Sequence, residues 1–493
     1  MSDSYIAIDL GATSGRVILG TISDQDITLE TIHRFPNVFR QKDGHDRWDL
    51  NGLWAEILKG LGIVGQRCAD GKINLRSIGA DSWGVDFGLF DKSGKILGDP
   101  VAYRDNRTQG MMEKVFQIIP SGELYHITGI QFMPFNTIFQ LYAQVKSGEW
   151  PERADRLLMV PDIIHYFLCG EMAGEYTNAS TTQLLNVSTK EWEKTLSCKL
   201  GIKHDMLPRI CSAGNILGVV KEVVRDETKL PSIPVVQPAT HDTGSAVVGT
   251  PLNEGWAFIS SGTWSLIGIE SSEPFTGPKP FQLNFTNEGG AYGTIRFLKN
   301  VTGLWILESC RKEWQAQGDC LEYGELVRQM SLLPFLPAYL NPDHPSFLNP
   351  PSMVETIREF LVRTGQRAQW NQVELSAIIL QSLALKYAGV IREIEEITGS
   401  PVKGVHIVGG GSQNAFLNQL TADACGLNVL AGPAEATALG NVLVQAIADG
   451  RFKDISEARS FVRGSLSLIS YSPRDRKPYP GRIAEFKRIA LIG

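Results

Sequence analysis

The sequence lacks the features that mark several large classes of protein. Its 47 basic residues stand against 53 acidic residues, so it has none of the basic excess that is typical of nucleic-acid-binding proteins. The sequence contains no run of 18 or more apolar residues, so no membrane-spanning helix is expected. The first residues lack the features of a secretory signal. We therefore expect a cytoplasmic protein, a monomer or small homo-oligomer, with neither nucleic acid nor membrane as a partner.

Cysteine pairs and the simplest nucleotide motif are also absent. The seven cysteines include no CxxC pair, which favours reduced thiols packed in the interior. His165 and Cys169 are four residues apart, but no further ligands accompany them, so core packing is favoured over a metal site. The P-loop pattern GxxxxGK[ST] does not occur, and a GxGxxG match at 60–65 follows helical rather than strand spacing.

Two similar hairpins are present about half a chain apart. Residues 5–8 and 17–19 are predicted strands around a turn at 9–16, and residues 256–259 and 266–269 surround a second turn at 260–265. This repetition predicts two duplicated lobes, although two hairpins could also resemble each other by chance. We place the boundary so that the lobes are 1–249 and 250–493, and leave open that the last residues pack back on the first lobe.

Strands and helices alternate in the C-terminal third. Apolar residues recur with helical spacing from 375 to 394, and Gly399 and Pro401 should end that helix. We predict strands at 405–408 and 428–430, each followed by a helix, at 414–424 and 433–448. This alternation predicts an α/β lobe in which helices cover a sheet.

The first turn carries the residue types of a phosphate-binding loop. Its backbone N–H groups and hydroxyls can cradle phosphate oxygens, and Arg16 can neutralise their charge. Asp9, at the end of the strand, can hold a hydrated Mg²⁺. A plain hairpin turn without a ligand is the alternative. The candidate phosphate-binding groups of this turn are the backbone N–H groups of 11–14, the hydroxyls of Thr13 and Ser14, and the guanidinium of Arg16.

The second half of the chain adds two candidate nucleotide contacts. Thr263 offers a further hydroxyl in the second turn. Gly410 and Gly411 lie between a strand and a helix, where contacts to adenosine and the α-phosphate fit. A βα loop without a ligand is the alternative for this glycine-rich turn.

Two further segments indicate catalysis and sugar binding. Asp242 follows an apolar strand and is a candidate base for a hydroxyl proton in phosphoryl transfer, with a helix-capping role as the alternative. In the segment 81–87, Trp83 offers an apolar platform, Gly84 allows close approach of the backbone, and Asp86 can bind hydroxyls. A half-buried strand explains the alternation of this segment equally well.

Together these segments resemble the FGGY carbohydrate kinases of the actin-like ATPase superfamily, in order along nearly the whole chain. The similarity lies in residues 9–16, 81–86, 241–243, 260–265 and 409–414, with more at 284–290 and 298–300. The resemblance implies an α/β fold of two duplicated ribonuclease-H-like lobes with a central cleft. Sugar binding and the first phosphate hairpin would belong to 1–249, and nucleotide binding to 250–493.

The resemblance also implies an activity, the transfer of the ATP γ-phosphate, with Mg²⁺, to the 1-hydroxyl of L-rhamnulose. Asp242 would be the general base. The residues expected to contact ATP are Ala12, Thr13, Ser14, Gly15, Arg16, Thr263 and Gly410. Tyr103 stands where a common family pattern has Trp, which puts sugar contacts from that loop in doubt. The residues expected to hold the sugar are Gly84, His241, Thr243 and Asn300.

Two other functions stay open from the sequence. A kinase for a related ketose such as L-fuculose would carry the same ATP motifs, because the two sugars differ only in hydroxyl configuration. An actin-like ATP-binding switch would use the same phosphate turns but would need neither Trp83 and Gly84 nor the segment 241–243.

Overall fold

A computed structural model describes residues 2–474 and 479–492. The chain forms two compact units, and neither is a single stretch of sequence. The first contains Met1–Pro251, Glu270–Phe297 and Ala436–Leu466, and the second contains Leu252–Ile269, Leu298–Glu435 and Ser467–Gly493. The single boundary between 249 and 250 stays a prediction, and it differs from these units because two later segments pack with the first unit.

A six-stranded sheet forms the centre of the first unit. Strand β1 pairs antiparallel with β2 and parallel with β6, and this register sets Asp9 opposite Arg16 on one side and Asp81 on the other. In spatial order the strands are β11 (Ile216–Val219), β12 (Pro234–Val236), β6 (Asn74–Ser82), β1 (Asp3–Leu10), β2 (Ser14–Ile22) and β3 (Ile27–Pro36).

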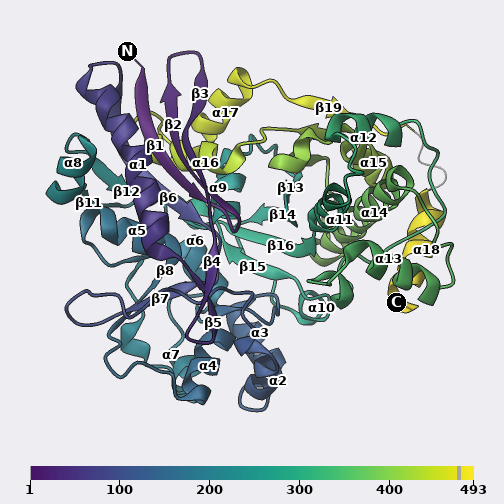
Figure 1. Cartoon of the computed structure of the whole chain (residues 1–493), viewed down its shortest axis with the longest axis horizontal. Coiled ribbons are helices and arrows are strands. Elements are labelled where there is room, and N and C mark those ends of the chain that lie inside the picture. The colour runs from purple at the N-terminus through teal and green to yellow at the C-terminus, as the bar shows by residue number, and fades with distance from the viewer. Residues whose placement is uncertain (1, 475–478, 493) are drawn as a thin grey trace. The chain divides into compact units, whose positions relative to one another are not determined.

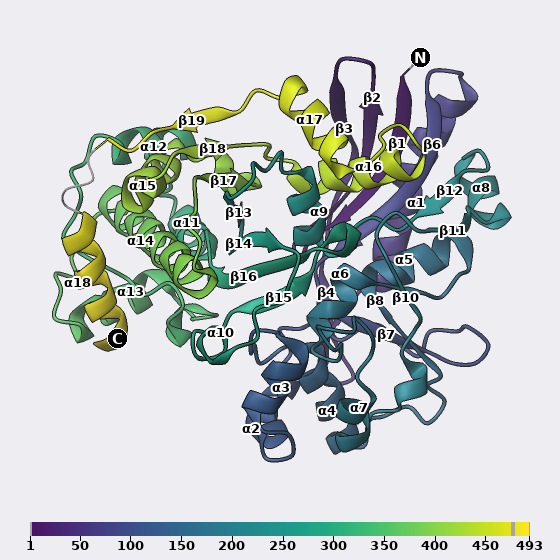
Figure 2. The same ribbon diagram turned by 180° about the vertical axis from the view of Figure 1, so that it is seen from behind.

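Helices cover both faces of this sheet, so its central strand is apolar on both sides. Ile6 and Ile8 of β1 pack in one core cluster with α1 (Leu50–Ala69) and α5 (Val160–Cys169). Tyr5 and Ala7 belong to a second cluster, which includes α16 (Ala436–Ala448) and α17 (Ile455–Ser465). Figure 1 shows α1 across one face, and Figure 2 shows α16 and α17 from the other side.

Further elements of the first unit surround this sheet. Its other strands are β4 (Phe39–Lys42), β5 (His45–Trp48), β7 (Phe87–Phe90), β8 (Arg156–Met159), β9 (Gly174–Glu175), β10 (Ile210–Cys211) and β15 (Thr286–Gly289). Its other helices are α2 (Met111–Phe116), α3 (Ser121–Thr128), α4 (Thr137–Ser147), α6 (Tyr176–Ala179), α7 (Lys194–Lys199), α8 (Glu222–Thr228), α9 (Asp242–Gly249) and α10 (Pro278–Gln282).

The second unit also has a sheet with helices. Its strands lie in the order β16 (Ile295–Thr302), β14 (Trp264–Ser271), β13 (Ala257–Ser261), β17 (Val405–Val408), β18 (Val429–Ala431) and β19 (Ile469–Tyr471). Strands β14 and β16 each have an end in the first unit. The helices are α11 (Trp305–Ala316), α12 (Tyr323–Met330), α13 (Met353–Arg363), α14 (Gln372–Thr398), α15 (Ala415–Cys425) and α18 (Tyr479–Ile492).

Helix α14 forms much of the core of the second unit. Asn371 and Glu374 close its start in a capping box, and Gly399 ends it with a φ of 68°. Among the described residues it is the one helix long and apolar enough to cross a membrane, yet 83% of its most apolar window is buried inside the protein. Burial of this kind is what a core helix of a folded unit requires.

Most elements expected from the sequence are confirmed, including both hairpins and the helix through 60–65. The strand expected as one explanation of Trp83–Phe87 is wrong, because residues 83–86 form a loop in which Val85 has a φ of 69°. The last predicted helix begins at Ala436 rather than at 433, and residues 410–413 form a 3₁₀ turn. His165 is buried and its Nε2 accepts from Ala80 N at 3.0 Å, so core packing is confirmed there.

Candidate active site

The turn between β1 and β2 is held in one shape by the protein itself. Gly11 N donates to Ser14 O at 2.9 Å across the turn. Asn37 adds a side-chain hydrogen bond to Gly11 O at 2.9 Å and a backbone one to Thr13 O at 3.1 Å. A Cβ on Gly15 would collide with the ring of Phe35, so only glycine fits there. Thr13 is exposed, and its hydroxyl is available to an anion.

Two carboxylates lie side by side where β1 and β6 end. Arg16 donates through Nη2 to Asp9 Oδ2, so the predicted phosphate-binding arginine and metal-binding carboxylate form an ion pair. Asp81 is fully buried, and Asn441 of α16 donates to its Oδ2 at 2.5 Å. Burial, reinforced by the charge of Asp9 and then of Asp242, raises the pKa of Asp81 well above its usual value, against the opposing effects of Asn441 and Arg16. Ionisation of Asp81 is therefore disfavoured, and a cation bound beside it would favour the carboxylate form.

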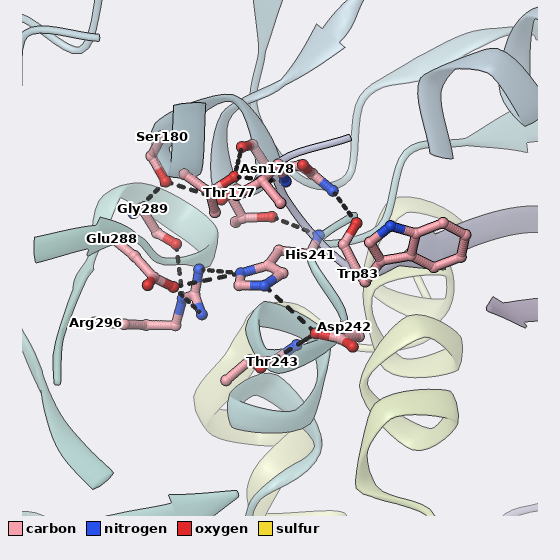
Figure 3. Close-up of polar contacts among 12 residues, drawn as sticks. Trp83, Thr177, Asn178, Ser180, His241, Asp242, Thr243, Glu288, Gly289 and Arg296 are labelled. Carbon is pink, nitrogen blue, oxygen red and sulfur yellow. Dashed lines mark hydrogen bonds and ion pairs between the residues drawn. The ribbon is translucent and has the colours of Figure 1, made fainter. Parts of the chain in front are cut away.

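Asp242 is the first residue of α9, and its carboxylate is 34% exposed. Thr243 donates to Asp242 Oδ1 from its backbone N at 2.6 Å and from its hydroxyl at 3.2 Å. His241 Nε2 lies 3.5 Å from the same oxygen. Asp242 follows the N-cap residue His241, so its carboxylate lies in the first turn of α9, near the positive end of the helix dipole. Figure 3 shows the three side chains together.

The backbone after β6 runs directly beside this segment. Ser82 N donates to Thr240 O at 2.9 Å, and Ser82 pairs with His241 in an isolated parallel bridge. A Cβ on Gly84 would lie 3.3 Å from His241 Nε2 and 3.0 Å from Thr181 Oγ1. The structure therefore brings Gly84 and the segment 241–243 together, as a shared binding site for a small molecule requires.

Asp86 is the last residue of the loop at 83–86 and is fully buried. Its Oδ2 accepts from the indoles of Trp48 at 2.7 Å and Trp83 at 3.0 Å and from Tyr103 N at 3.1 Å, while its Oδ1 accepts from Gln140 at 3.2 Å. Burial raises its pKa to about 6 in spite of these donors. The binding of a sugar hydroxyl by Asp86 stays a prediction, and the contacts present here fix the position of Trp83.

The predicted nucleotide contacts of the second unit also come together. Thr263 lies in the turn between β13 and β14, where its carbonyl accepts from Gly303 N at 3.0 Å. β13 pairs parallel with β17, and a Cβ on Gly411 would collide with Ser261 Oγ at the end of β13. Gly410 has open space around its Cα, and Asn300 lies in β16 of the same unit.

Sequence reasoning gave no role to several residues that complete the first-unit site. The sequence does contain a pattern that could have identified Asp81 as a site residue. Asp81 follows the apolar run at 78–80, just as Asp9 follows the apolar run at 6–8. Asn441, Glu288 and Arg296 carry no local signal, since they contact the site from segments far away in the sequence.

The carboxylates suit a cation that keeps its own water. Among the described residues no group of three or more His, Cys, Asp or Glu side chains could enclose a metal ion. Mg²⁺ is usually held by one or two carboxylates together with waters and substrate phosphates, and Asp9 beside Asp81 provides that kind of partial site. The residues present therefore fit a magnesium ion brought in with a nucleotide.

Solved structures with a similar fold are kinases of small polar molecules. Xylulose kinase from Rhodospirillum rubrum matches with a TM-score of 0.80 at 16% identity, covering 99% of this chain and 98% of that one. Gluconate kinase from Lactobacillus acidophilus matches with a TM-score of 0.79 at 16% identity, covering 100% and 97%. Glycerol kinase from Plasmodium falciparum, solved with ADP, matches at 0.77 and 16%, covering 99% and 98%. These likenesses confirm the predicted actin-like α/β fold.

Comparison with protein families and curated relatives shows the class of this protein, an ATP-dependent sugar kinase. Residues 4–249 match the N-terminal domain of the FGGY family of carbohydrate kinases, and residues 257–448 match its C-terminal domain. A rhamnulokinase from Bacteroides thetaiotaomicron is 42% identical over 489 residues, 99% of each chain. One from Pectobacterium atrosepticum is 43% identical over 494 residues, 99% of this chain and 96% of that one. The chain belongs to the FGGY family of carbohydrate kinases.

Proposed function

We propose that this protein transfers the γ-phosphate of ATP to the 1-hydroxyl of L-rhamnulose, giving L-rhamnulose 1-phosphate and ADP in L-rhamnose catabolism. The observation that carries the proposal is the pair of relatives named rhamnulokinase, 42% and 43% identical over 99% of this chain. The accessible carboxylate of Asp242, beside His241 and Gly84, supplies the chemistry. We propose a cytoplasmic enzyme that is a monomer or a small homo-oligomer.

Asp242 acts as the general base. Its carboxylate accepts the proton of the sugar hydroxyl as that oxygen bonds to the γ-phosphorus, while the bond from the γ-phosphorus to the β–γ bridging oxygen breaks and ADP leaves. Thr243 N, donating at 2.6 Å, holds one carboxylate oxygen in place. A carboxylate is a weak base for an alcohol, and it suffices because the proton leaves late in a loose transition state.

The proposed ATP contacts come from three turns of the chain. The first turn supplies backbone N–H groups, hydroxyls and the charge of Arg16, and the second unit supplies Thr263 and the turn at Gly410 and Gly411. Asp9 holds Mg²⁺, which when bound offsets the negative charge of the phosphates. The first-turn residues proposed for ATP are Ala12, Thr13, Ser14, Gly15 and Arg16.

The loop after β6 and the start of α9 provide most of the proposed contacts to the sugar. Gly84 leaves room for the sugar, and His241 and Thr243 offer polar groups next to the base. Asn300 adds a contact from β16. Asp86 contributes through Trp83, whose indole it holds at 3.0 Å.

A ketose panel tests the substrate assignment. The protein is incubated with ATP, Mg²⁺ and either L-rhamnulose, L-fuculose or no sugar, and the product is identified by phosphorus–proton coupling in NMR. We expect the highest kcat/KM with L-rhamnulose and coupling to the protons on carbon 1. A higher kcat/KM for L-fuculose contradicts the sugar assignment, and ATP consumption that does not depend on sugar supports the ATP-switch alternative.

Replacement of the base tests the mechanism. Asp242→Asn keeps the size of the side chain but cannot accept the proton, so we expect kcat to fall by about 10²- to 10⁴-fold while ATP affinity stays near normal. Glu222→Gln is the matched control, because Glu222 is likewise the acidic first residue of a helix, α8. Near-wild-type turnover of Asp242→Asn, or an equal loss in the control, removes the assigned role.

A further inference from the structure

Arg296 is a fully buried arginine that faces the candidate site. It lies in β16, and its Nε donates to Gly289 O at 2.8 Å while its Nη1 lies 3.1 Å from Glu288 Oε2. Its Nη2 lies 3.0 Å from His241 Nδ1. Figure 3 shows the guanidinium between the imidazole and the end of β15. A buried arginine is expensive to desolvate unless it is paired, and Arg296 has three polar partners here.

The contact with Arg296 determines which imidazole nitrogen carries the proton. A guanidinium has only donors, so His241 Nδ1 must accept this hydrogen bond and cannot hold a hydrogen. The ring hydrogen then sits on Nε2. That nitrogen lies 3.5 Å from Asp242 Oδ1 and 3.3 Å from where a Cβ on Gly84 would be. The N–H donor is therefore directed at the place where the sugar is proposed to bind.

Glu288 would favour the opposite tautomer if it were alone. Its Oε2 lies 3.4 Å from His241 Nδ1 and is only an acceptor when ionised, so it would stabilise a hydrogen on that nitrogen. Arg296 pairs with Glu288 and occupies Nδ1 at the shorter distance of 3.0 Å. Glu288 thus favours a hydrogen on Nδ1 of His241, whereas Arg296 favours a hydrogen on Nε2. The closer contact of Arg296 makes the Nε2–H tautomer the favoured one.

The backbone of His241 is fixed independently of its ring. His241 N donates to Thr177 Oγ1 at 3.1 Å, and Thr177 donates to the buried carboxylate of Glu175 at 2.5 Å. Glu175 also accepts from the N and the hydroxyl of Thr240, both at 2.9 Å. Because these contacts hold the main chain, loss of Arg296 changes the proton position on the ring more than it changes where the ring lies.

We propose that Arg296 is a positioning residue that fixes His241 as the Nε2–H tautomer, so that the imidazole presents a hydrogen-bond donor to the sugar beside Asp242. The part of this inference that concerns the sugar rests on the function proposed above, whereas the tautomer itself does not. Asp242 and Glu288 are the acidic groups that face the ring, and Arg296 is the cationic one.

The tautomer is read in the ligand-free protein by long-range proton–nitrogen NMR correlations of labelled histidine. The His241 signals are assigned by their loss in His241→Asn. We expect a protonated Nε2 in the wild type and a change to a protonated Nδ1 in Arg296→Met, where Glu288 is left as the acceptor. Arg296→Lys, which keeps a donor, should restore the Nε2–H form wherever the ammonium reaches the ring.

Kinetics test the consequence for the substrate. Arg296→Met should lower kcat/KM for the ketose by about 10- to 100-fold, mostly through KM, and leave the KM for ATP unchanged. Arg459→Met is the matched control, because Arg459, whose side chain is 13% exposed, likewise donates to a backbone carbonyl and pairs with a glutamate. The control should lose stability without the change in the ketose KM.

Several results would overturn the inference. A hydrogen on Nδ1 of His241 in the wild type overturns it. This test needs no Arg296 variant, so it holds even if Arg296→Met does not fold. An unchanged tautomer in a folded Arg296→Met, or equal loss of kcat/KM in Arg459→Met, also overturns it. If the wild type phosphorylates none of the ketoses but shows the Nε2–H form, the proposed function fails and the tautomer assignment stands.

Discussion

Asp86 allows a sharp test of how burial controls charge in this protein. Its pKa rises from the ordinary 3.8 to about 6, chiefly because burial disfavours the carboxylate, while the indoles of Trp48 and Trp83 and the amide of Gln140 oppose that shift. The folded state therefore binds this proton more tightly than the unfolded state. The stabilisation that comes from protonation of Asp86 is fully present below pH 3.8 and is lost as the pH rises through about 6.

The size of the effect follows from the shift. A change of about two pKa units corresponds to roughly 3 kcal/mol at about 1.4 kcal/mol per unit. We therefore expect the difference in unfolding free energy between the wild type and Asp86→Asn to change by about 2.4 kcal/mol between pH 4 and pH 7, in favour of the variant at the higher pH. Other titrating groups largely cancel in this difference, because the two proteins share them.

The indole N–H signals of Trp48 and Trp83 report the titration directly, because both indoles donate to Asp86 Oδ2. Both should shift with a midpoint near pH 6 in the wild type and not in Asp86→Asn. Trp192, whose indole donates to Pro208 O, is the internal control and should not show this transition. A midpoint near 4, or the same transition in the variant, refutes the claim that burial outweighs the donors.

Two further predictions concern packing and phosphate binding. Gly440→Ala should lower the free energy of unfolding by about 1–3 kcal/mol or more, measured by thermal denaturation, because its Cβ would collide with the carbonyl of Ser245 where α16 crosses α9. The control Gly389→Ala, inside α14 with open space around it, should instead be neutral or stabilising. Arg16→Met should raise the KM for ATP by about 10-fold or more and leave the KM for the ketose unchanged. Steady-state kinetics with each substrate varied measures both values, and an equal rise in the two KM values would contradict a specific role in ATP binding.

Local patterns were enough to predict the elements that carry the candidate site. The turn at 9–16 and the turn at 260–265 were predicted from apolar runs around glycine and hydroxyl residues, and both are confirmed. The end of α14 at Gly399 follows from the left-handed conformation that glycine adopts at low cost. The loop at 83–86 was harder to predict, because Trp83, Val85 and Phe87 alternate with the period of a strand. In the structure Val85 instead has a positive φ, which a strand does not allow.

Contacts between distant segments decided the electrostatics of the site. Asn441 reaches Asp81 across 360 positions of the chain, and Arg296 reaches His241 across 55. No periodicity or turn signal in the sequence couples such residues, so the sequence did not reveal the four protein donors that contact Asp86. The division into units also depends on late segments that pack with early ones.

By itself the sequence determined the two hairpins with their hydroxyl and glycine turns, the alternation of strands and helices in the C-terminal third, and the place of Asp9 at a strand end. These features depend on backbone geometry and on the alternation of apolar residues over a few positions, which a sequence displays directly. Only the tertiary structure decided which carboxylates are buried, what donates to each, and which nitrogen of His241 keeps its hydrogen. Those properties depend on desolvation and on donors from remote segments, which exist only once the chain has packed.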